Sequence, residues 1–143
     1  MSQQMARTPG AKRAGDGEYV FDLSAVNHIL GGPDYSTANG ACVEGERMIV
    51  ALMRMPAGTG AEPHSHPNEQ WIYILQGTFR AKIGEKEIEA KPGGLCSLQR
   101  RALRGGHARG RCRVLHMQGC VPQPARRQGG VRTAGSKRFG RRK

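Results

Sequence analysis

The stretch that decides the fold runs from Gly58 to Gly77 and reads GTGAEPHSHPNEQWIYILQG. Within it, His64 and His66 stand two residues apart, and Gln70 follows four residues later. Residues two apart in a β-strand point to the same face, so both imidazoles can be aimed at one point. Gln70 has the same parity and can add an oxygen. The pattern therefore predicts a site for a divalent metal.

The spacing of these residues resembles the first motif of the cupin family, in which a glycine at each end brackets His-x-His and an acidic or amide residue. The Gln70 position is usually Glu in cupins, and Glu69 is a lesser candidate because its spacing is one residue short. The resemblance implies an all-β, cupin-like antiparallel β-barrel of the jelly-roll type. It also implies one divalent metal, and mixed nitrogen and oxygen ligands suit Mn, Fe, Ni, Co or Zn. The alternative is an unrelated β-hairpin protein with two surface histidines.

The segments around the motif carry the signals of short antiparallel strands. Residues 47–55, RMIVALMRM, are almost wholly apolar and predict a strand that is covered on both faces. Residues 71–75 and 79–83 predict two strands of a meander with a turn at 76–78, and 87–90 begin a third strand. Strands at this spacing are typical of a barrel or sandwich.

The strand after Gln70 presents two different faces. Ile72 and Ile74 share the parity of Gln70 and are expected to line the pocket. Three apolar or amphipathic side chains face the opposite way: Trp71, Tyr73 and Leu75. An outer face this apolar usually needs a cover. The chain's own early strands could supply it, or a second subunit could, because cupins commonly form homodimers through such a face.

The charge is distributed unevenly along the 143 residues, whose net charge is +12. Residues 1–94 hold nine Lys or Arg and all eleven Asp or Glu, whereas residues 95–143 hold fourteen Lys or Arg and no acid. We therefore expect a disordered N-terminal tail (1–17), a cupin-like barrel (18–94) and a basic Arg/Gly-rich tail (95–143). Residues 18–23 are a candidate first strand, and residues 25–30 are a candidate strand or single helical turn.

The basic tail can be interpreted in two ways. It can be a disordered arm that binds nucleic acid non-specifically through phosphate contacts. It can also be a cupin half translated out of frame, because Arg, Gly, Ala and Cys are what GC-rich DNA yields in a wrong frame. Codons for residues 99–131 can be chosen so that a neighbouring frame encodes an apolar strand and a His preceded by Asn-Ala-Val. Under either interpretation the barrel is expected to be incomplete at its C-terminal side.

A cupin requires a further His ligand from a second motif in this region. Family spacing places that ligand near residue 104, where Arg104 stands, and His107 is the nearest histidine and a weak candidate for a fourth ligand. Cys and His at short intervals can also bind zinc. The residues at such intervals here are His107, Cys112, His116 and Cys120. Their spacing contains no Cys-x-x-Cys knuckle, which favours chance.

These features lead to several functional hypotheses. The leading one is a metal-binding cupin that acts on a small molecule, as a lyase, isomerase or dioxygenase for sugars, uronates or aromatic compounds. The residues do not decide whether it is an enzyme, and the alternatives are a non-catalytic small-ligand domain and a non-specific nucleic-acid binder. No apolar run reaches the roughly 20 residues of a membrane span. The N-terminus lacks the apolar core of a signal peptide, so we expect a cytoplasmic protein.

Overall fold

The computed structural model describes residues 5–31, 36–64, 68–98 and 104–119. Apart from one short 3-10 turn, η1 (Leu23–Ala25), its regular elements are strands, and the all-β prediction is confirmed. The strands are β1 (Lys12–Arg13), β2 (His28–Leu30), β3 (Asn39–Glu44), β4 (Met48–Met55), β5 (Gly60–His64), β6 (Gln70–Ile83), β7 (Lys86–Ala90), β8 (Leu95–Leu98) and β9 (Arg104–Gly119). In this part of the chain, no helix has the length and apolarity that a membrane crossing requires.

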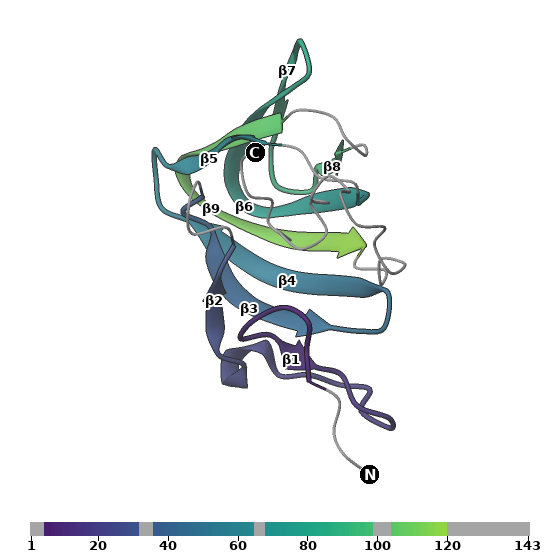
Figure 1. The fold of residues 1–143 in the computed structure, drawn as a ribbon. Helices are drawn as coiled ribbons and strands as arrows, with labels where there is room; N and C mark the ends of the chain where they lie inside the picture. The colour runs from purple at the N-terminus through teal and green to yellow at the C-terminus, as the bar shows by residue number, and fades with distance from the viewer. Residues whose placement is uncertain (1–4, 32–35, 65–67, 99–103, 120–143) are drawn as a thin grey trace, which may run out of the picture.

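The described strands form one sheet in the order β1-β3-β4-β9-β6-β7, with β2 added to β3, β5 to β9 and β8 to β6. The β1–β3 pair is parallel and the other pairs are antiparallel. The path ends at β1 and β7, at opposite ends of the molecule (Figure 1), so the sheet is open. The prediction of a cupin-like barrel that is incomplete is therefore confirmed.

Strand β4 is where residues 47–55 predicted it, but its two faces differ. Ile49, Ala51 and Met53 are buried, whereas Met48 and Val50 are exposed. Within the described part of the chain, only the inner face of β4 is covered, whereas we predicted that both faces are. An almost wholly apolar run fits a half-buried antiparallel strand here, because no described segment covers the outer side.

Strand β6 runs without interruption through residues 76–78, where we expected a turn between two strands. Its register with β9 shifts on both sides of Gln76, so the irregularity is a β-bulge and the strand bends without reversing. Gly77 lies at this bulge with φ +80°. A Cβ atom on Gly77 would lie 2.2 Å from the carbonyl oxygen of Arg111, so β9 can approach only a glycine.

Strand β9 comes from the region in which the sequence indicated no strand. It pairs with β6 along its whole length, and on its other edge with β5 and then β4. Its buried residues recur at every second position from Cys112 to Gln118. They are Cys112, Val114, His116 and Gln118, a mixture of apolar and polar types that hides the alternation. β8 and β9 thus extend the sheet 25 residues beyond Gly94, to Gly119; residues 120–143 lie outside the described part.

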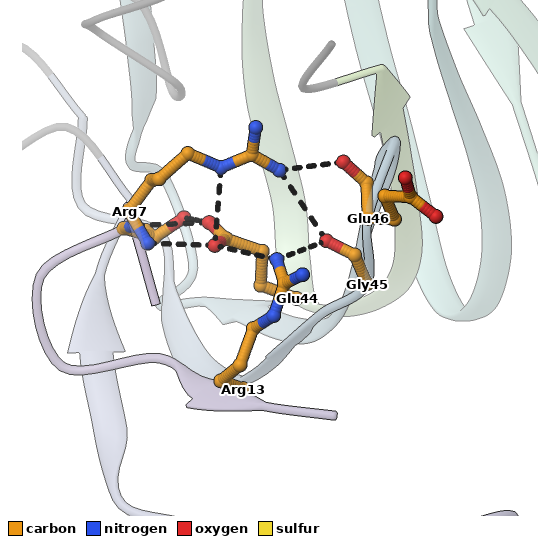
Figure 2. Close-up of polar contacts among 6 residues, drawn as sticks. Arg7, Arg13, Glu44, Gly45 and Glu46 are labelled. Carbon is orange, nitrogen blue, oxygen red and sulfur yellow. Dashed lines mark hydrogen bonds and ion pairs between the residues drawn. The ribbon is translucent and has the colours of Figure 1, made fainter. Parts of the chain in front are cut away.

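The described part of the N-terminal segment, from residue 5 onward, contacts the end of β3. Figure 2 shows the guanidinium groups of Arg7 and Arg13 beside the carboxylate of Glu44, whose side chain is 0% exposed. The carboxylate accepts hydrogen bonds from the backbone N–H groups of Arg7 (2.6 Å) and Thr8 (2.9 Å). A carboxylate buried this fully requires such hydrogen-bond donors and cationic partners. The expected first strand is absent, because residues 18–22 form no strand.

The core lies on the inner face of the sheet, between β4, β6, β8 and β9. Its buried apolar side chains include Ile49, Met53, Ile74 and Val114. The three described cysteines, Cys42, Cys96 and Cys112, are buried and none of them is in a disulfide. Burial raises the pKa of the Cys96 and Cys112 thiols because the thiolate form would lose its hydration.

Candidate functional site

A cavity of about 70 Å³ opens on the inner face of the sheet, over β4, β6 and β9. Three of its lining residues have an imidazole or amide side chain: His64, Gln70 and His116. All three side chains are buried. They come from three strands, β5, β6 and β9, so the polar end of the cavity exists only once those strands have paired.

His64 is the last residue of β5, and its ring is held by its own strand. Its Nδ1 lies 2.8 Å from the carbonyl oxygen of Glu62. A carbonyl only accepts, so Nδ1 carries the proton and Nε2 carries the lone pair. A histidine that ligates a metal has this arrangement, with one ring nitrogen donating to a backbone or carboxylate oxygen.

Gln70, His116 and Gln118 form a chain of hydrogen bonds between β6 and β9. The amide Nε2 of Gln70 donates to Nδ1 of His116 at 3.0 Å, and Nε2 of His116 donates to Oε1 of Gln118 at 3.0 Å. Both contacts are satisfied by one neutral tautomer of His116, protonated at Nε2. The Nε2 of Gln118 is buried and has no hydrogen-bond partner among the described residues. Gln70 uses its nitrogen towards His116, so its oxygen is the atom with which it could bind a cation.

The proposed ligands can now be placed. His64 and Gln70 line the same cavity. His66 lies outside the described residues. His107 pairs through its backbone with Gly60 of β5 and Arg80 of β6. Its side chain is not among those that the structure describes. Glu69 is exposed and accepts a hydrogen bond from Trp71 Nε1 at 2.8 Å, on the outer side of the sheet.

His116 is the site residue that the sequence did not single out as a cavity residue. In the sequence, His116 belongs only to the zinc-like spacing of His107, Cys112, His116 and Cys120. Among the described residues, no group of three or more His, Cys, Asp or Glu side chains is placed to hold a metal ion. The alternation from Cys112 to Gln118 was the signal that could have assigned His116 to the inner face.

The comparisons agree with this architecture. Residues 51–117 match the family described as the cupin domain. None of the curated proteins matches the chain in sequence.

Several solved structures resemble the fold. KdgF from Halomonas sp. has a TM-score of 0.63 and 16% identity, over 76% of this chain and 96% of that one. A predicted oxalate decarboxylase from Thermotoga maritima has a TM-score of 0.61 and 17% identity, over 71% and 98%. The cupin domain of Schizosaccharomyces pombe Cnp3 has a TM-score of 0.59 and 17% identity, over 70% and 72%. Likeness at this level of identity concerns the fold. Residues 51–117 thus match the cupin domain, and the described sheet has the fold of these cupin structures.

Proposed function

We propose that the chain is a cupin that binds a small molecule in its inner cavity and holds a divalent metal there. The proposed metal ligands are His64, His66 and Gln70, with His107 as a weak fourth. The observation that carries this proposal is the convergence of His64 and Gln70 on one cavity. The Glu62 carbonyl supports it further, because it selects the His64 tautomer whose Nε2 can bind a metal.

The donor set is chemically compatible with the metals that the resemblance implies. Imidazole nitrogen and amide oxygen are neutral ligands of the borderline type that Mn, Fe, Ni, Co and Zn accept. A metal held there would act as a Lewis acid on an oxygen of the bound molecule. The residues of the chain contribute orientation and the exclusion of water, because the donors are buried. Among lyases, isomerases and dioxygenases the reaction stays open, and a non-catalytic ligand domain would use the same cavity.

The metal proposal is tested by the metal content of the purified protein. We expect close to one equivalent of a divalent metal in the wild type, measured by inductively coupled plasma mass spectrometry, and a loss of at least tenfold in His64→Ala. The matched control is His28→Ala, because His28 is an exposed histidine of β2 that contacts Arg54 at 3.0 Å. Equal metal content in His64→Ala and the wild type, with both folded by circular dichroism, would contradict the proposal.

We also propose that a second subunit covers the outer face of the sheet. This outer apolar face comprises Met48, Val50, Trp71, Tyr73, Leu75 and Leu95, all exposed among the described residues. Strand pairing makes it continuous, because Val50 and Trp71 both lie opposite Met117 in the register of β4, β9 and β6. An apolar face of this kind favours burial in an interface.

A further inference from the structure

The walls of the cavity differ in character from its polar end. Six apolar side chains form most of the lining: Met53, Met55, Ile72, Phe79, Leu98 and Val114. All six side chains belong to the buried core. None of the described lining residues is Lys, Arg, Asp or Glu. A bound molecule therefore meets hydrocarbon and thioether surface on most sides.

The polar groups are confined to a small part of the lining. Within the described residues they are His64, Gln70 and His116, with Ser36 the further polar side chain. The hydroxyl oxygen of Ser36 already accepts a hydrogen bond from the backbone N–H of Ala38 at 3.1 Å. Among the described residues, the polar part of the lining thus consists of these four side chains, and the rest of the lining is apolar or glycine.

The size of the cavity limits the ligand as well. A volume of about 70 Å³ holds roughly five waters, since one water needs about 10–15 Å³ measured in this way. A molecule of comparable size has only a few carbon atoms and one polar group. Each hydroxyl beyond the first would face an apolar wall and lose its hydrogen bonds to water without replacement, which is unfavourable.

We propose that the cavity selects a compact molecule with a single polar head and an apolar body, in preference to a polyhydroxylated molecule such as a sugar or uronate. The head lies against His64, Gln70 and His116, and the body lies against the six apolar walls. This inference rests on the proposed function, in which the cavity is a small-molecule site. It holds whether the head contacts the side chains directly or through a bound metal, because the walls are the same.

The test compares two probes with the same number of non-hydrogen atoms, cyclopentanol and glycerol. Each is titrated into the full chain labelled with ¹³C at its methionine methyl groups. Met53 and Met55 report on the cavity, and the exposed Met48 of the outer apolar face is the internal control. We expect saturable shifts at Met53 and Met55 with cyclopentanol, at least tenfold weaker binding of glycerol, and no change at Met48.

A pair of matched variants tests the wall itself. Val114→Thr is nearly isosteric and adds one hydroxyl to the cavity lining, whereas Val50→Thr makes the same change on the outer apolar face. The preference for cyclopentanol over glycerol should fall at least threefold in Val114→Thr and stay unchanged in Val50→Thr. An unchanged preference in a folded Val114→Thr would overturn the assignment of the wall.

The wild-type titration separates failure of this inference from failure of the proposed function. Glycerol binding as tightly as cyclopentanol at Met53 and Met55 overturns the ligand class but leaves a small-molecule site in place. Shifts with neither probe overturn both. Equal shifts at Met48 with cyclopentanol indicate a non-specific effect and overturn the inference too.

Discussion

The buried carboxylate of Glu44 gives the sharpest prediction about stability. It lies at the end of β3, fully buried, and contacts Arg7, Thr8 and Arg13 of the N-terminal segment (Figure 2). Oε2 accepts from the backbone N–H of Arg7 and lies 3.5 Å from the guanidinium groups of both Arg7 and Arg13. Oε1 accepts from the backbone N–H and the hydroxyl of Thr8. Glu44→Gln keeps the shape of the side chain and removes its charge.

The size of the effect follows from these contacts. The amide of Gln can accept at only one of the two positions, so its NH₂ group must face either the donors of Thr8 or the N–H of Arg7 and two guanidinium groups. A hydrogen bond to a charged group contributes about 1.5–3 kcal/mol. Removing one partner of a buried ion pair costs about 3–5 kcal/mol. We therefore expect Glu44→Gln to lower the free energy of unfolding by about 3–5 kcal/mol, a large part of the roughly 5–15 kcal/mol of a typical domain.

Urea denaturation and hydrogen exchange together measure this effect. With a urea m-value of about 1–3 kcal/mol/M, the unfolding midpoint should fall by at least about 1 M. The amide of Ala14, which donates to the Glu44 carbonyl at 2.9 Å, should lose protection. Glu46→Gln is the matched control, because Glu46 is exposed and only its backbone carbonyl meets Arg7. An unchanged midpoint together with unchanged protection of Ala14 in Glu44→Gln would refute the reasoning.

Two further predictions concern β6 and the outer apolar face. Gly77→Ala should destabilise the protein more than Gly58→Ala in thermal unfolding. Both glycines have positive φ, where an alanine costs about 1–2 kcal/mol, but only at Gly77 would the added Cβ also lie 2.2 Å from a backbone carbonyl oxygen. Equal losses of stability would argue against the close approach of β9. If a second subunit covers the outer apolar face as proposed, the wild type should sediment as a dimer and the double variant Trp71→Ala/Tyr73→Ala as a monomer in sedimentation velocity. Arg80→Ala is the exposed β6 control, and a wild-type monomer would contradict the proposed second subunit.

Local patterns in the sequence predicted much of the fold around the motif. The parity of Gln70, Ile72 and Ile74 placed these residues on the buried face, because side chains alternate strictly along a strand. The same parity placed Trp71 and Tyr73 on the outer face, where they are exposed. The two glycines at the ends of the motif both adopt positive φ, which any residue with a Cβ avoids.

The structure differs from the predictions at Gly77, β4 and β9, each for a physical reason. Gly77 was interpreted as a hairpin turn because a bulge and a turn use the same residue type, and only the neighbouring strand β9 distinguishes them. The prediction that both faces of β4 are covered differs from the described structure because apolar composition alone does not specify which segment packs against a strand. The strand β9 was missed because Cys, Gln and His on its inner face break the usual contrast of apolar and polar residues.

By itself, the sequence determined the all-β class and the faces of strand β6 after Gln70. The tertiary structure alone decided that His116, 46 residues from Gln70, completes the polar end of the cavity. Parity assigns a residue to a face but not to a partner. The register of β6 on β9, with Ile72 opposite His116 and Gln70 opposite Gln118, makes that choice. Register is fixed by the pairing of whole strands, so it emerges only when the sheet forms.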